Sequence, residues 1–179
     1  MQRVIQLSIM PWGMINCFLI KGSDKHILVD TGIPGSTKRI ISQLRKANIK
    51  LEDIALIIVT HGHIDHFGSA AELKDILNAP ILIHQLDQAA LTSGKSLIET
   101  LKANNLFWDI VLKPKLAKDR AVSCEPDIIL HNNEVFDLSI HGIAREKPWL
   151  MKTNTAITRT DLVFHGGKLN AINRLQFSV

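Results

Sequence analysis

Three histidines and an aspartate lie within six positions of one another in the stretch THGHIDHFGS, residues 60–69. These residues are His61, His63, Asp65 and His66, and they follow the apolar run IALIIV. Imidazole nitrogens and carboxylate oxygens are ligands that suit zinc. A single histidine at this place could be explained by a hydrogen bond. Three histidines and an aspartate so close together, without a cation, would form a coupled and poorly solvated titrating group. The H-x-H-x-D-H spacing therefore predicts a metal site.

The chain around the cluster is expected to bring the four side chains together. His61 and His63 are two apart, so at the extended end of a strand they point to one side. Gly62 between them permits a sharp turn or a close backbone approach. Asp65 and His66 are expected at the start of the next helix, where the helix dipole favours the carboxylate.

The remaining sequence predicts the elements that position the cluster. Residues 54–59 form a short apolar run rich in β-branched side chains, which predicts a strand buried on both faces. Ser36 is expected to cap the helix that follows it. Strands are predicted at 2–9, 14–21, 26–29, 81–84 and 161–164, helices at 37–48, 68–78 and 85–112 (broken near Gly94), and two strands joined by an Asn-Asn turn at 127–143. This order predicts an α/β sandwich with a mixed sheet.

Composition narrows the class of protein. With 179 residues, 46% hydrophobic and 21% charged, the chain is expected to be one soluble domain rather than a disordered segment. The net charge is +4, but the basic residues are scattered, so a nucleic-acid partner is not expected. No apolar stretch is long enough to span a membrane.

Two further features favour a cytoplasmic protein. Cys17 and Cys124 lack metal-binding or redox spacing, which favours reduced thiols, with one disulfide as the alternative. Pro11, Gly13 and Asn16 interrupt the apolar N-terminus, so two strands and a turn are expected there instead of a signal peptide.

The stretch THGHIDHFGS resembles the signature of the metallo-β-lactamase superfamily of metal-dependent hydrolases. The resemblance extends to INCFLIKGSDKHILVDTGIPGS and LEDIALIIVTHGHIDHFGSAAEL, and it covers residues 14–143. It implies one domain over residues 1–179 with an αβ/βα sandwich and a site at the sheet edges between its halves. Residues 144–179 match poorly, which implies a degraded or truncated, shortened second half.

The resemblance also implies roles for individual residues. His61 and His63 are similar to ligands of a first ion, and Asp65 and His66 to ligands of a second. Asp161 resembles the aspartate that bridges both ions, although Thr160 stands where a glycine is usual. Asp30 resembles the aspartate that orients a ligand histidine through its other ring nitrogen, with a turn-forming role before Gly32 as the alternative.

Two histidines of the family pattern are not found, which leaves enzymatic activity an open question. The third histidine of the first site has only poor substitutes in His141, Asn154 and His165, and the final histidine has none. Catalytic zinc usually takes three protein ligands and a water. With fewer ligands, both the affinity for the ion and the hold on that water should fall.

If active, the chain is expected to be a zinc-dependent hydrolase. The resemblance implies one or two zinc ions, with iron or manganese as alternatives, and a metal-bound hydroxide that attacks an ester or thioester. Asp65 would hold an ion and take up a proton, and the small-molecule substrate would be similar to those of hydroxyacylglutathione hydrolases. The alternatives are a catalytically impaired remnant and a metal-dependent nuclease.

The shortened second half is expected to leave sheet edges unpaired, and such edges favour association into a homodimer.

Overall fold

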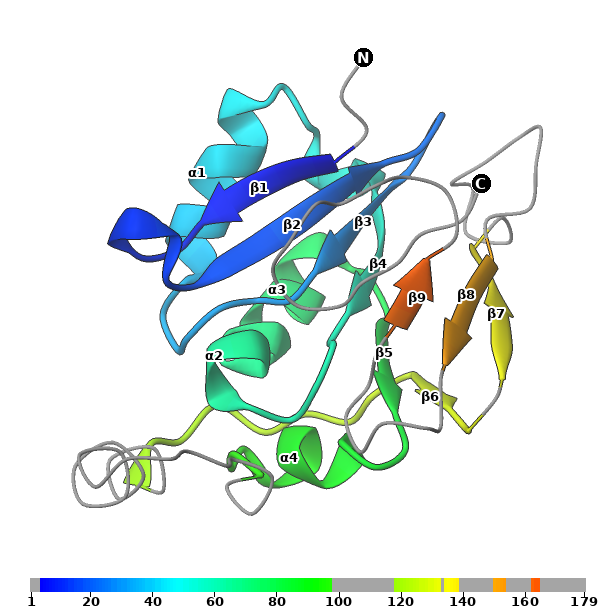
Figure 1. Cartoon of the computed structure of the whole chain (residues 1–179). Helices are drawn as coiled ribbons and strands as arrows, with labels where there is room; N and C mark the ends of the chain where they lie inside the picture. The colour runs from blue at the N-terminus through cyan, green and yellow to red at the C-terminus, as the bar shows by residue number, and fades with distance from the viewer. Residues whose placement is uncertain (1–3, 98–117, 133, 139–149, 154–161, 165–179) are drawn as a thin grey trace.

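The fold is built on a six-stranded mixed sheet (Figure 1), and the histidine cluster follows the strand formed by residues 54–58. The computed structural model describes residues 4–97, 118–132, 134–138, 150–153 and 162–164. The strands lie in chain order, with antiparallel pairing from β1 to β3 and parallel pairing from β3 to β6. They are β1 (Val4–Ser8), β2 (Asn16–Lys21), β3 (His26–Val29), β4 (Ile54–Ile58), β5 (Ile81–His84) and β6 (Ile128–Leu130).

Helices cover one face of this sheet. They are α1 (Thr37–Lys46), α2 (Ile64–Phe67), α3 (Ala70–Leu77) and α4 (Gln88–Ser93), with short 3₁₀ turns η1 (Pro11–Gly13) and η2 (Leu51–Asp53). Leu28 and Ile57 of the sheet pack in one core with Leu44, Phe67 and Leu73 of the helices, and all five are fully buried. The apolar stripe of α1 is what anchors that helix, since its other positions are mostly charged.

The opposite face of the sheet packs against a second, three-stranded antiparallel sheet. This sheet consists of β7 (Val135–Asp137), β8 (Leu150–Thr153) and β9 (Leu162–Phe164), in that order. Leu56 and Ile58 of β4 share a core with Phe136 and Leu138. Because Ile57 faces the helices, β4 is buried on both faces, as the composition of residues 54–59 predicts.

One local expectation was wrong, and two others were confirmed with details that the sequence does not show. Ser36 precedes α1 but makes no capping bond, and in the described part of the chain its buried Oγ has no hydrogen-bond partner. The helix expected over 68–78 is present as α3, but it starts at Ala70 and follows a separate α2, because the backbone of Ser69 between them is not helical (φ −114°, ψ 19°). The two strands expected within 127–143 are present as β6 and β7, and each belongs to a different sheet.

Several predictions concern residues outside the described ones. They are the helical stretch beyond residue 97 and the side chains of His141, Asn154, Asp161 and His165. Among the described helices, none combines the length and the apolar character needed to cross a bilayer.

The packing predicts that Phe67 is a major source of stability. Phe67 of α2 is fully buried in the core between the helices and the sheet. Phe67→Ala should lower the free energy of unfolding by about 3–5 kcal/mol, through lost burial and a residual cavity, as measured by urea denaturation. Ile76 is 50% exposed on α3, so Ile76→Ala is the control and should cost far less. Equal losses for the two variants would contradict this packing.

Candidate metal centre

Asp30 lies at the end of β3 and turns its carboxylate toward the end of β4. Its backbone has φ 61°, in the left-handed region that Asp tolerates better than most residues. Its amide donates to the Ile58 carbonyl at 2.8 Å, which continues the parallel pairing for one residue. Its Oδ1 accepts from the Thr60 amide at 2.9 Å, and the Thr60 hydroxyl lies 2.9 Å from both carboxylate oxygens. The carboxylate, only 4% exposed, is thereby fixed at the base of the cluster.

His66 is held on this carboxylate. Its Nδ1 lies 2.8 Å from Oδ2 of Asp30. An ionised carboxylate only accepts hydrogen bonds, so Nδ1 is the protonated nitrogen and donates. The His66 carbonyl in turn accepts from the amide of Thr31 at 2.7 Å and from its hydroxyl at 3.0 Å. When the imidazole is neutral, these contacts leave Nε2 as the nitrogen that carries the lone pair.

The tautomer of His61 follows from its contact with Thr60. Its Nδ1 lies 3.0 Å from Oγ1 of Thr60. The single hydroxyl hydrogen of Thr60 is directed to Asp30, whose oxygens cannot donate, so Oγ1 accepts from Nδ1–H of His61. His61 and His66 therefore both carry the lone pair on Nε2, and one buried carboxylate determines both assignments.

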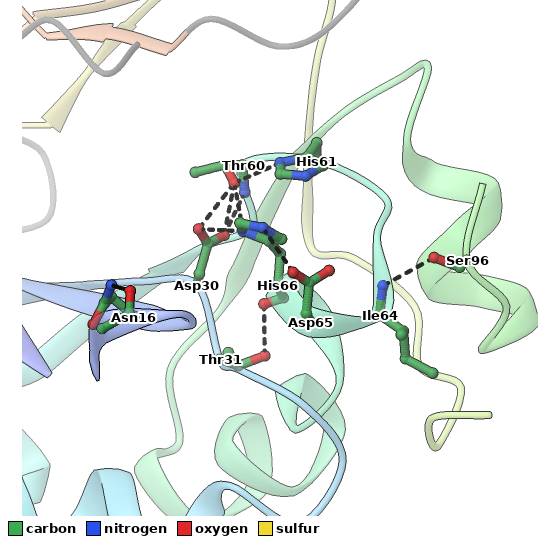
Figure 2. Close-up of polar contacts among 10 residues, drawn as sticks. Asn16, Asp30, Thr31, Thr60, His61, Ile64, Asp65, His66 and Ser96 are labelled. Carbon is green, nitrogen blue, oxygen red and sulfur yellow. Dashed lines mark hydrogen bonds and ion pairs between the residues drawn. The ribbon is translucent and has the colours of Figure 1, made fainter. Parts of the chain in front are cut away.

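The four predicted residues lie together, and Figure 2 shows three of them, His61, Asp65 and His66. The His61 ring is 3.9 Å from the His66 ring and 4.5 Å from the His63 ring, measured between centroids. Oδ2 of Asp65 is 3.5 Å from Nε2 of His66, and the Asp65 side chain is 37% exposed. The cluster is thus held by the buried carboxylate of Asp30 on one side and is exposed to solvent at Asp65 on the other.

The backbone reaches this arrangement by a different route from the expected one. β4 ends at Ile58, so His61 and His63 are not the last residues of an extended strand. Instead, the chain turns tightly at Gly62, where the His63 amide donates to the His61 carbonyl at 3.0 Å. Asp65 and His66 lie in the short helix α2, as predicted.

The chemical types of these donor atoms suit a divalent cation, although the donors are not arranged around a common centre. Imidazole nitrogens and a carboxylate oxygen suit zinc, and a carboxylate behind a histidine is a usual support for such a ligand. Within the described ranges, no three His, Cys, Asp or Glu side chains are placed to hold an ion. The fit to an ion is therefore one of donor type and of the tautomers of His61 and His66.

Sequence reasoning missed the residues that support the cluster. Thr60 contacts the imidazole of His61 through its hydroxyl, and Thr31 donates to the backbone carbonyl of His66. Asp87 and Ser96 bind the backbone of the cluster at Gly62 and Ile64. Only Thr60 carries a signal, because it lies between the apolar run and the first histidine. The others lie far along the chain, where nothing in the spacing relates them to the cluster.

The two cysteines do not act as prepared nucleophiles. Burial, with a smaller contribution from the charge of Asp30, raises the pKa of the Cys17 thiol well above its ordinary value. Burial also raises the pKa of Cys124. Because the thiolate is the reactive form, neither side chain is activated for attack.

The contacts of His66 predict its titration in the metal-free protein. Burial lowers the pKa of His66, but the charge and hydrogen bond of Asp30, with the charge of Asp65, raise it more, to a net value above 6.5. Asp30→Asn should therefore lower this pKa, and Asp65→Asn should lower it less. Histidine titration followed by NMR measures both, and a larger drop in Asp65→Asn would contradict the assignment.

The sign of the pH dependence follows from this raised pKa. Protonated His66 is stabilised in the folded state, so its contribution is fully present below pH 6.5 and is lost as the pH rises through the folded-state pKa. The free energy of unfolding of metal-free protein should fall over that interval, and the fall should shrink in Asp30→Asn. Urea denaturation across the interval tests this, and an unchanged profile in the variant would contradict it.

The relatives match about half of the chain, whereas the solved structures match most of it. A probable metallo-hydrolase of Methanocaldococcus jannaschii is 35% identical over 100 residues, which are 56% of this chain and 45% of that protein. The exodeoxyribonuclease WalJ of Streptococcus pneumoniae is 33% identical over 82 residues, 46% of this chain and 30% of that protein. The matched region thus spans less than half of each relative's own length.

The fold agrees with these matches. A class B3 di-zinc metallo-β-lactamase from an Alaskan soil metagenome superposes with a TM-score of 0.59 at 19% identity, over 88% of this chain and 57% of that chain. The family model of the metallo-β-lactamase superfamily matches residues 10–142, which include β2 to β7 and the whole histidine cluster. The chain therefore belongs to the metallo-β-lactamase superfamily.

Proposed function

We propose that the chain is a metal-dependent hydrolase that binds zinc and cleaves an ester or thioester of a small molecule. The observation that carries this proposal is the pairing of Asp30 with Nδ1 of His66 at 2.8 Å, inside a cluster of three imidazoles and a carboxylate. A purely structural histidine does not need a buried carboxylate to select its tautomer. A histidine that binds an ion ordinarily donates its other ring N–H to a carboxylate, a backbone carbonyl or a water, which leaves the lone pair of the first nitrogen for the ion.

The residues that would hold the ion are those of the cluster. His61, His63 and His66 would supply imidazole nitrogens, and Asp65 a carboxylate oxygen. The lone pair on Nε2 of neutral His66 and Oδ2 of Asp65, 3.5 Å away, form a place that favours a positive charge. A divalent ion bound by such donors acts as a Lewis acid and lowers the pKa of water, which makes hydrolysis feasible at neutral pH.

The chain's own residues divide the remaining work. Asp30 and Thr60 keep Nδ1 of both His66 and His61 protonated, so that the orientation of the rings is set before a substrate arrives. Asp65 is the cluster residue with a partly exposed carboxylate, and we assign the uptake of a proton during hydrolysis to its Oδ1, the oxygen that does not face His66. Neither thiol is activated, which argues for direct attack by water instead of a covalent acyl-enzyme.

The unbridged thiols also support a cytoplasmic location as part of this proposal. Cys17 is buried and Cys124 is partly buried, and no disulfide joins them. Such free thiols are typical of reducing compartments.

A metal-dependent nuclease is the second candidate function. It is supported by the match to a Streptococcus pneumoniae protein named as an exodeoxyribonuclease. A catalytically impaired remnant is the third, because two histidines that the family pattern requires beyond the cluster were not found in the sequence.

Metal content tests the proposed site. Wild-type protein loaded with zinc and dialysed should retain at least one ion per chain by elemental analysis, and the double variant His61→Ala/His63→Ala should lose it. The matched control is His131→Ala, which removes an exposed histidine elsewhere and should retain the ion. A wild type that retains no zinc would contradict the proposal and favour the remnant.

Substrate choice is tested with the same proteins. The zinc-loaded wild type should hydrolyse an acylglutathione thioester or a nitrophenyl ester, and His61→Ala/His63→Ala should lose at least about 100-fold in kcat/KM, as expected when a metal site is dismantled. Degradation of single-stranded DNA without thioester or ester hydrolysis would favour the nuclease. Activity that is equal in the double variant would show that the cluster is not the catalytic site.

A further inference from the structure

The turn at Gly62 is held by a segment more than twenty residues further along the chain. Oδ1 of Asp87 accepts from the Gly62 amide at 2.8 Å, and the Gly62 carbonyl accepts from the Leu97 amide at 2.8 Å. The amide of Ile64, two residues after Gly62, donates to Oγ of Ser96 at 3.1 Å. Three backbone groups of the histidine turn are therefore bound by the stretch that contains α4 and the residues just beyond it.

Packing keeps the turn in contact with this segment. A Cβ on Gly62 would lie 2.7 Å from Cβ of Ala90 and 2.8 Å from Cδ1 of Leu97, so only glycine permits the approach. The same Cβ would lie 3.1 Å from Oδ1 of Asp87. The absent side chain at Gly62 thus allows the carboxylate to reach the backbone between the two histidines.

Asp87 occupies a place where an aspartate would ordinarily cap a helix. It directly precedes α4, yet its side chain makes no capping bond to that helix. It is only 9% exposed, and burial of a carboxylate is costly unless its oxygens accept hydrogen bonds. The hydrogen bond from Gly62 offsets part of the cost of burying the Asp87 carboxylate. This bond also means that the carboxylate faces the histidine cluster and not the first turn of α4.

We propose that Asp87 is a positioning residue for the metal centre. Its carboxylate fixes the Gly62 peptide and thereby sets the spacing of His61 and His63, the neighbours of Gly62 on either side. This inference rests on the proposed function, because it concerns the affinity of the cluster for an ion. The position of the hydrogen-bonding oxygen matters, so a side chain with an oxygen at the same place should substitute for the carboxylate.

The experiment compares zinc affinity, measured by competition with a chromophoric chelator, and the Gly62 amide proton shift in metal-free protein, measured by NMR. Asp87→Ala should weaken zinc binding by about 10- to 100-fold, the range seen when groups supporting a ligand are removed, and move the Gly62 signal upfield. Asp87→Asn retains an oxygen at the same distance and should preserve both. Asp87→Glu keeps the charge but displaces the oxygen, and should impair both.

The matched control is Asp127→Ala. Oδ2 of Asp127 accepts from the Ile81 amide at 2.8 Å, the same kind of bond at the opposite end of β5. Its loss should lower stability but leave the zinc affinity unchanged, which separates positioning from general destabilisation. If Asp87→Ala does not fold, the Asn and Glu variants carry the test.

The outcomes separate the two proposals. A wild type that binds no zinc would overturn the proposed function. A wild type that binds zinc with the same affinity as folded Asp87→Ala or Asp87→Glu would overturn only the role of Asp87. So would an Asp87→Asn variant that loses affinity while its Gly62 amide signal stays in place.

Discussion

One buried carboxylate determines how the histidine cluster is arranged. Asp30 joins the end of β3 to the end of β4 through Thr60, and it joins both strands to α2 through His66. The left-handed backbone at Asp30 is what lets the carboxylate leave the direction of its strand and reach the neighbouring one. A carboxylate at 4% exposure is stable only because it accepts several hydrogen bonds at once, so the cluster and its support depend on each other.

The parallel arrangement of the central strands places this support. β3, β4 and β5 run in the same direction, so their carboxyl ends meet at one edge of the sheet. Asp30 follows β3, Thr60 and the histidines follow β4, and Asp87 follows β5. Ligand sites commonly lie at the carboxyl ends of parallel strands, because the strands there are rigid while the loops between them are exposed.

Much of this could be predicted from the sequence, because the relevant signals are local. The apolar run before the cluster identified β4, and the H-x-H-x-D-H spacing identified residues that do lie together. The turn at Gly62 was allowed for, but its cause was not, since it depends on Asp87 and Leu97. The pairing of β6 and β7 with different sheets was also missed, because a short polar turn between two strands looks the same whether or not they pair.

Supporting residues were the hardest to predict for a physical reason. A ligand histidine is marked by its type and spacing, whereas Thr31 or Ser96 contributes one hydrogen bond to the backbone, which many residue types could make. Asp87 looks like an ordinary helix-capping residue in the sequence. Only the three-dimensional contacts show that its carboxylate serves the histidine turn instead.

The central claim is that Asp30 keeps Nδ1 of His66 protonated so that Nε2 can bind an ion. Long-range proton–nitrogen correlation spectra of the histidine side chains, recorded during a zinc titration, test it most directly. We predict that the Nδ1–H of His66 persists through the titration while the Nε2 signal of His66 shifts on binding. Loss of the Nδ1 proton with zinc at that nitrogen, or a His66 signal that zinc does not move, would contradict the account.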